Sequence, residues 1–375
     1  MKIKYSQTSN NIVNFSNSLL ARFGVTPFHE TIKQIDDVIK NANRIAVLLF
    51  DGLGTALIQK HLPKGAWLPR HHLHTITSTF PPTTVAATNG LLSGRYPIET
   101  GWLGWSQYFQ EVAANVDLFS GKNNLTKEPL LDPNHIRELL DYPSILTLIK
   151  DKNPTYHVNS VWPSIVRSEG AKSLDEFFAM MSTQCTITGP SFVYGYWVSP
   201  DLEIHDYGTD HPNVKKVIRA INDGVETLSK QHPTTLFLVL SDHGLIDVDF
   251  ISEQENDLLF SMLERPFSNE PRSANFYVKK GKHRPFAKLF NQRYGRRFIL
   301  KSRQQVIDEQ WYGKGNPHPI TDKFIGDFLA ISVDKASFDH LKEGKLAHGD
   351  VKGHHAGLTE DEMNIDIMAI NIKNR

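Results

Sequence analysis

The chain has 375 residues, of which 40% are hydrophobic and 22% are charged, the balance of an ordinary globular protein. This length can bury one large core, or a core with a smaller added unit. The 41 basic and 41 acidic residues cancel to a formal charge of zero, so the sequence lacks the basic excess of a typical nucleic-acid-binding protein. We therefore expect no nucleic-acid polymer as a partner.

Cys185 is the only cysteine, which excludes an intrachain disulfide and suits a reducing compartment. Residues 1–20 contain scattered polar side chains and lack the continuous apolar core of a signal peptide. No apolar run approaches the roughly 20 residues needed to cross a bilayer. We predict a cytoplasmic protein without a membrane partner, and the composition leaves a homo-oligomer open.

Helix and strand patterns alternate through the first 248 residues. In chain order they predict helices over residues 10–23 and 31–40, a strand ending at Asp51, a strand over 71–79, helices over 84–92 and 144–150, strands over 156–161 and 192–198, a helix over 214–228 and a strand that begins at Leu236 and ends at Asp242-His243. The runs ending at Phe50 and Leu240 are almost purely apolar, as expected for central strands covered on both faces. The alternation predicts a three-layer α/β/α sandwich around a mostly parallel sheet.

The pattern loosens after Val248. A strand-like run at residues 273–279, a basic stretch near 284–303 and a Gly/Pro-rich stretch at 311–319 follow one another without clear alternation. We interpret residues 249–324 as a small inserted cap or lid, and residues 1–248 with 325–375 as the core. Strands predicted over 327–333 and 366–372 are expected to return to the core sheet.

Metal-binding side chains follow several of these strands directly. The candidate ligands are Asp51, Asp201, His205, Asp242, His243 and His355. Charged groups at the carboxyl ends of parallel strands lie where α/β folds place their active sites. Aspartate and imidazole together suit zinc, with manganese as the alternative, better than magnesium or calcium. So many ligands exceed the needs of one tetrahedral ion, and they predict two divalent metal ions.

Thr84 is the candidate nucleophile. It stands at the expected start of a helix, after Pro81 and Pro82, where backbone N–H groups and the helix dipole favour a phosphoryl oxygen. A nearby metal ion would lower the pKa of its hydroxyl and make attack feasible near neutral pH. The neighbouring Thr83 is the alternative nucleophile, and a simple helix N-cap is the structural alternative for Thr84.

Five motifs in a fixed order give these residues a family resemblance. They are Asp51-Gly52, Phe80-Pro81-Pro82-Thr83-Thr84 with Ser93-Gly94-Arg95-Tyr96-Pro97, Pro200-Asp201 through His205, Asp242-His243-Gly244, and Gly353-His354-His355. The set resembles the type I phosphodiesterase/nucleotide pyrophosphatase family of the alkaline phosphatase superfamily. The resemblance implies an alkaline phosphatase-like fold, with one metal ion at Asp201, His205 and His355. It implies a second at Asp51, Asp242 and His243, with Thr84 attacking phosphorus.

Trp105 marks a departure from that family. Nucleotide pyrophosphatases usually carry an asparagine shortly after the Tyr-Pro segment, and counting along this chain places Trp105 there, as a candidate substrate-binding residue. The expected substrate is a small phosphorylated molecule, a nucleotide or another phosphodiester. A phosphomonoesterase or a phosphonate hydrolase of the same superfamily is the alternative, and a non-catalytic metal- or ligand-binding protein is the alternative from a different class.

Overall fold

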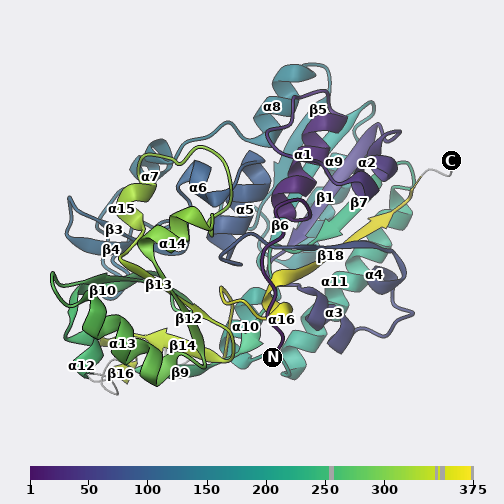
Figure 1. The fold of residues 1–375 in the computed structure, drawn as a ribbon. Coiled ribbons are helices and arrows are strands. Elements are labelled where there is room, and N and C mark those ends of the chain that lie inside the picture. The colour runs from purple at the N-terminus through teal and green to yellow at the C-terminus, as the bar shows by residue number, and fades with distance from the viewer. Residues whose placement is uncertain (253–256, 343–344, 347–350, 373–375) are drawn as a thin grey trace.

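The computed structural model describes residues 1–252, 257–342, 345–346 and 351–372. Six strands form the central sheet: β1 (Arg44–Phe50), β2 (His72–Thr77), β5 (His157–Val161), β6 (Ser191–Trp197), β7 (Leu236–Leu240) and β18 (Asn364–Ile370). Their order is β2-β18-β7-β1-β6-β5, and only β18 runs against its neighbours (Figure 1). β1 is central and parallel to both flanking strands, with Val47 opposite Tyr194 and Leu238.

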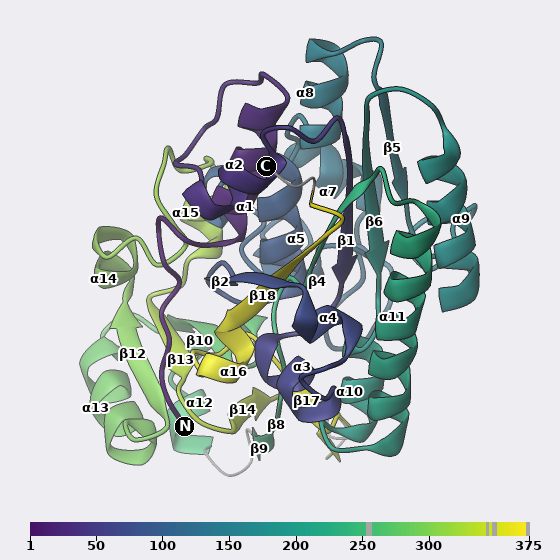
Figure 2. The ribbon, with the colours of Figure 1, turned by 90° about the vertical axis from the view of Figure 1, so that its right-hand side faces the viewer.

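Helices cover both faces of this sheet (Figure 2). On one face lie α1 (Ile12–Arg22), α2 (Lys33–Ile39), α5 (Thr84–Ser93) and α8 (Ile145–Lys152). On the other lie α3 (Thr55–His61), α4 (Trp67–Arg70), α9 (Leu174–Thr186) and α11 (Pro212–Gln231). Alternate residues of β1 enter the two cores, with Val47 in the first and Leu48 in the second, which explains its continuous apolar sequence. The predicted three-layer α/β/α sandwich with a mostly parallel sheet is confirmed.

A second, antiparallel sheet lies beside the sandwich (Figure 1). Its strands, in spatial order, are β12 (Phe298–Ser302), β13 (Phe328–Ser332), β11 (Ser273–Val278), β10 (Leu263–Glu270), β3 (Ser106–Phe109) and β4 (Ala114–Asp117). α12 (Asp257–Phe260) and α13 (His283–Tyr294) pack on one face. α7 (Pro133–Leu139), α14 (Arg303–Asp308) and α15 (Thr321–Phe324) pack on the other.

The expected path of one strand is wrong. β13 joins this second sheet, between β12 and β11, and does not return to the central one. Its residues are buried on both faces, with Leu329 in one core and Ala330 in the other. A short apolar run of this kind predicts burial but cannot specify which sheet it enters. The expected insertion 249–324 supplies β10, β11 and β12, while β3, β4 and β13 come from outside it, so that boundary stays a prediction.

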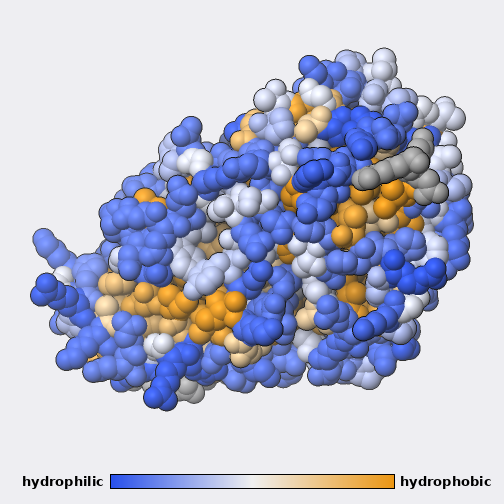
Figure 3. All heavy atoms as spheres, turned by 45° about the vertical axis from the view of Figure 1, so that its right-hand side comes forward, coloured by the Kyte–Doolittle hydropathy of each residue, from blue (hydrophilic) through white to orange (hydrophobic). Residues whose placement is uncertain are grey.

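Short elements complete the described chain. They are α6 (Pro97–Thr100), α10 (Asp201–Tyr207), α16 (Glu360–Met363), and the pairs β8 (Ile246–Asp247) with β17 (Gly353–His354), β9 (Asp249–Ser252) with β14 (Ala336–Asp339), and β15 (Leu341–Lys342) with β16 (Lys345–Leu346). Among the residues described, no helix has the length and apolar character to span a bilayer. The face drawn in Figure 3 is mainly hydrophilic, with hydrophobic patches between the polar side chains.

Candidate active site

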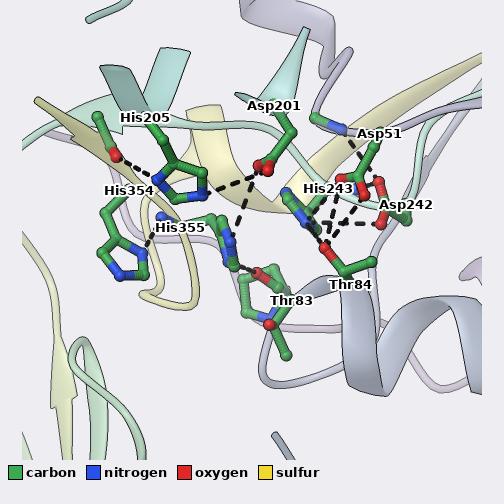
Figure 4. Close-up of polar contacts among 12 residues, drawn as sticks. Asp51, Thr83, Thr84, Asp201, His205, Asp242, His243, His354 and His355 are labelled. Carbon is green, nitrogen blue, oxygen red and sulfur yellow. Dashed lines mark hydrogen bonds and ion pairs between the residues drawn. The ribbon is translucent and has the colours of Figure 1, made fainter. Parts of the chain in front are cut away.

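The ends of three neighbouring strands bring the candidate residues together (Figure 4). Asp51 directly follows β1, Asp242 lies two residues beyond β7, and Asp201 begins α10 shortly after β6. Since these three strands are adjacent and parallel, their carboxyl ends share one edge of the sheet. His355 reaches the same place from near the C-terminus, directly after β17.

The candidate ligands form two groups of three, here called triads. Asp51, Asp242 and His243 form the first group. One ligand atom of each lies within 4.8 Å of the others, and all three residues are buried. Asp242 Oδ1 accepts hydrogen bonds from the backbone N–H groups of Gly52 at 3.1 Å and His243 at 3.0 Å. These bonds fix the carboxylate, while His243 Nε2 lies 3.3 Å from Asp51 Oδ1.

Asp201, His205 and His355 form the second group, with the same limit of 4.8 Å between ligand atoms. The His205 Nε2 atom lies 3.3 Å from Asp201 Oδ2, and His355 Nε2 lies 3.9 Å from Asp201 Oδ1. The rings of His243 and His355 stack with their centroids 4.0 Å apart, so the two groups are neighbours. These are the same two sets of residues that the family resemblance implied.

Each of the three candidate imidazole ligands directs its Nδ1 atom at a backbone carbonyl group. In His243, His205 and His355 the Nδ1 atom faces a backbone carbonyl oxygen at 3.2, 2.8 and 3.2 Å respectively. Those carbonyls belong to Gly244, Gly353 and Pro82. Because a carbonyl oxygen only accepts, each Nδ1 is expected to carry the proton, which leaves the Nε2 lone pair free for a metal ion.

Two buried carboxylate oxygens, one in each group, have no hydrogen-bond partner among the described residues. They are Asp242 Oδ2 and Asp201 Oδ1. No Lys or Arg among the described residues forms an ion pair with any of the three aspartates. Burying charge without compensation is costly, and a cation at each group would supply that compensation. Both groups therefore fit a divalent metal ion.

The charges of the carboxylates influence one another. Burial, aided by Asp242 and Asp201, raises the pKa of Asp51 well above its usual range. Burial also raises the pKa of Asp242. Burial opposes ionisation of Asp201 as well, but the neighbouring His205 lowers the pKa of that carboxyl below its ordinary value. The first group thus carries more repulsion between acids than the second.

Thr84 is the first residue of α5, and its hydroxyl contacts the first group (Figure 4). Its Oγ1 atom lies 3.2 Å from Asp51 Oδ2 and 3.2 Å from His243 Nε2. The Thr83 hydroxyl instead donates to Glu270 Oε1 at 2.6 Å, on the second sheet. Of the two candidate threonines, only Thr84 contacts a triad, which favours it over Thr83 as the reactive residue.

Two residues of the site carry no signal in the sequence. Tyr196, on β6, donates its hydroxyl to Asp51 Oδ2, and Glu270, at the end of β10, accepts from Thr83. Tyr196 lies in an aromatic strand that reads as core, and Glu270 lies in the segment where the pattern loosens. Neither belongs to a spaced motif, so only the tertiary structure brings them to the site.

A cavity of about 310 Å³ opens over Thr84 and the second group, and Asp201, His205 and His355 line it. Trp105 also lines it, with 38% of its surface exposed and its ring edge-on to Phe119. The predicted substrate-binding tryptophan therefore lies at the cavity, and its role there stays a prediction.

Comparisons with known proteins agree with this geometry. The model of the type I phosphodiesterase/nucleotide pyrophosphatase family matches residues 45–357. Human ectonucleotide pyrophosphatase/phosphodiesterase 5 is similar in structure, with a TM-score of 0.63 and 16% identity over 88% of this chain and 90% of that one. An inactive murine form of that protein, in complex with AMP, gives a TM-score of 0.60 and 16% identity over 87% of each chain.

Phosphonoacetate hydrolase from Sinorhizobium meliloti 1021, in complex with phosphonoformate, is also similar in structure. Its TM-score is 0.63, with 14% identity over 87% of this chain and 89% of that one. At such identities the similarity concerns the fold. Comparison with curated protein sequences finds no match.

Proposed function

Because the chain belongs to the type I phosphodiesterase/nucleotide pyrophosphatase family, we propose that it hydrolyses small phosphodiesters with two metal ions and Thr84 as nucleophile. One observation carries the proposal. The Thr84 hydroxyl lies 3.2 Å from both Asp51 and His243 of one triad, and the second triad lines the same cavity. Nucleophile, candidate ligands and space for a substrate thus occupy one place.

Asp51, Asp242 and His243 would hold one ion, and Asp201, His205 and His355 the other. When bound, such ions lower the pKa of a nearby hydroxyl and stabilise negative charge on phosphoryl oxygens. We propose zinc, with manganese as the alternative, because each triad mixes carboxylate oxygen with imidazole nitrogen. This mixed donor set is the support for the choice of metal.

The chain's own residues then perform two displacements. Thr84 Oγ1 bonds to phosphorus and expels one alcohol of the diester, which leaves with the proton that the Thr84 hydroxyl gives up. The phosphothreonine formed still carries the other ester group. Water then displaces Thr84 Oγ1 from phosphorus, one proton of the water returns to that oxygen, and a phosphomonoester is released. Each displacement inverts the configuration at phosphorus. The N–H groups of Thr84, Val85 and Ala86, which have no acceptor among the described residues, would donate to phosphoryl oxygens at the start of α5.

The test compares hydrolysis of bis(p-nitrophenyl) phosphate and p-nitrophenyl phosphate by zinc- or manganese-loaded protein. We expect a preference for the diester, and a loss of at least about 10³-fold in turnover for Thr84→Ala with the metal content unchanged. Thr88→Ala is the matched control, because Thr88 lies one turn along α5 and bonds only the Thr84 carbonyl. Full activity of Thr84→Ala would contradict the proposed nucleophile.

The remaining alternatives give distinct outcomes. A preference for the monoester would indicate a phosphomonoesterase. Silence on both esters with release of phosphate from phosphonoacetate would indicate a phosphonate hydrolase, whose known member from Sinorhizobium meliloti has a similar fold. Bound metal without turnover of any of these would indicate a binding protein. Because a relative is bound to AMP, nucleotide diesters are the first natural substrates to assay.

A further inference from the structure

Two carboxyl groups that belong to neither triad line the cavity, Glu270 and Asp339, and Glu270 is the one bonded to the residue before Thr84. Glu270 ends β10 and lines the same cavity as Thr84, Asp201 and His355, yet only 2% of its surface is exposed. No Lys or Arg of the described residues forms an ion pair with it, so its charge is balanced by no fixed cation. A buried carboxyl in this position requires an explanation.

Both hydrogen bonds of Glu270 go to a single oxygen. Oε1 accepts the Thr83 hydroxyl at 2.6 Å and the Trp105 backbone N–H at 2.7 Å. Oε2 has no hydrogen-bond partner in the part of the chain that the structure describes. The side chain is therefore fixed by one oxygen, while the other remains available to whatever fills the cavity.

The contact with Thr83 brings this charge to the nucleophile's helix. Thr83 is the N-cap residue of α5, a position where threonine commonly accepts an N–H of the first turn. Here its hydroxyl makes no such bond and donates to Glu270 instead. The uncapped N–H groups of the first turn, and the Thr84 hydroxyl beside them, thus lie next to a residue held directly by the Glu270 carboxyl.

Glu270 also lowers the net positive charge of the site. Two divalent ions would exceed the three triad aspartates by one positive charge. An ionised Glu270 opposes that excess, as does Asp339, while Lys127 on the same lining forms an ion pair with Asp117. A site with this added negative charge tolerates the single charge of a phosphodiester better than the double charge of a phosphomonoester. The phosphomonoester binds more weakly because the negative charge of Glu270 repels its second negative charge.

We propose that Glu270 is a specificity-determining residue, whose negative charge excludes doubly charged phosphomonoesters from the cavity and so selects singly charged phosphodiesters. The inference rests on the proposed phosphodiesterase function and names the substrate charge that this same site accepts. Burial raises the pKa of Glu270 to about 7, so the carboxyl is largely ionised at an assay pH of 8.5.

The test measures binding, so that it does not depend on turnover. Zinc-loaded Thr84→Ala protein is titrated at pH 8.5 with bis(p-nitrophenyl) phosphate and with p-nitrophenyl phosphate. We expect the diester to bind at least about tenfold more tightly than the monoester. Adding Glu270→Gln should tighten the monoester about tenfold and leave the diester within about twofold, because the charge is lost while the shape is kept.

Two further variants separate charge from structure. Glu270→Asp keeps the charge and should keep the monoester excluded, and Glu264→Gln, an exposed carboxyl on the same strand, should change neither affinity. Equal affinities in the Thr84→Ala parent, or an unchanged ratio in Glu270→Gln, would overturn the inference whether or not the wild-type protein turns over. Discrimination in binding with no wild-type hydrolysis would overturn only the proposed function. Failure to bind either ester would overturn both.

Discussion

Tyr196 orients one candidate ligand of the first triad, Asp51, through a hydrogen bond. Tyr196 lies on β6, and its buried hydroxyl donates to Asp51 Oδ2. Burial and the nearby aspartates raise the pKa of Tyr196 well above its ordinary value. The hydroxyl is thus a permanent donor that orients a candidate ligand. Loss of a residue that orients a metal ligand by a hydrogen bond commonly lowers the affinity for the metal.

Removal of this hydroxyl should weaken the metal site. We expect Tyr196→Phe to bind zinc about tenfold more weakly, measured by competition with a chelating dye, because Asp51 loses its fixed orientation. Tyr194→Phe is the matched control: it lies two residues away on the same strand, and its buried hydroxyl has no hydrogen-bond partner among the described residues. Equal zinc affinities in the two variants would contradict the role of Tyr196.

The ionisation of Glu270 should be visible in stability. Burial raises its pKa in the folded protein to about 7 from 4.5, so the folded state holds this proton more tightly than the unfolded state. The resulting stabilisation is fully present below pH 4.5 and is lost as the pH rises through 7. Relative to Glu270→Gln, the metal-free wild type should therefore lose about 3 kcal/mol of unfolding free energy across that window.

Urea unfolding of both proteins in the presence of a chelator, at intervals from pH 4.5 to 8.5, measures this difference. Comparison with the glutamine variant removes the common contribution of the other titrating groups. A difference that stays constant with pH would show that the carboxyl has an ordinary pKa in the folded protein.

At the scale of elements, the backbone segments that follow β1 and β7 lie too close together for a side chain at Gly244. Gly54 lies three residues after Asp51, and Gly244 directly follows His243. A Cβ atom on Gly244 would lie 2.0 Å from the Asp361 carbonyl oxygen and 3.3 Å from the Gly54 Cα atom. The glycine that ends the Asp-His-Gly motif is therefore required by backbone packing beside the first triad.

Gly244→Ala should accordingly displace that turn. We expect a loss of about 3 kcal/mol in unfolding free energy and weaker zinc binding, because the new methyl group meets backbone atoms that cannot rotate away. Thermal unfolding and zinc titration measure the two effects. Gly65→Ala, which would meet no atom within 4 Å, should behave as wild type, and similar behaviour of both variants would contradict the packing argument.

At the scale of the whole molecule, a buried ion pair connects the two sheets. Arg272, in the turn between β10 and β11, contacts Glu362 of α16 through Nε at 2.8 Å and Nη2 at 2.9 Å. Both side chains are fully buried, and α16 leads directly into β18 of the central sheet. Glu362 also accepts the backbone N–H of Gly357, two residues after His355.

Loss of one partner should leave an uncompensated buried charge. We expect Arg272→Met to reduce the unfolding free energy by about 3–5 kcal/mol in urea unfolding. Lys33→Met, which removes an exposed pair with Asp37, should cost less than about 1 kcal/mol. A small effect of Arg272→Met would mean that water or other donors replace the guanidinium.

The sequence by itself determined the local elements and the identity of the candidate ligands. The apolar runs of β1 and β7 predicted buried parallel strands, and the carboxylates after them predicted a site at one sheet edge, because chain direction alone places those ends together. The ordered motifs predicted the family, which the family model confirms, and the two ligand sets that the structure brings together. Each of these inferences depends on neighbours along the chain or on a fixed topology.

Only the tertiary structure decided what depends on contacts between distant segments. It placed β13 in the second sheet, turned the Thr83 hydroxyl away from α5, and brought Glu270 into the cavity, 187 residues from its partner Thr83. A short apolar strand can pair in either sheet, and an isolated glutamate in an irregular segment looks like any surface residue. Their roles follow from packing between the two sheets, which no local pattern encodes.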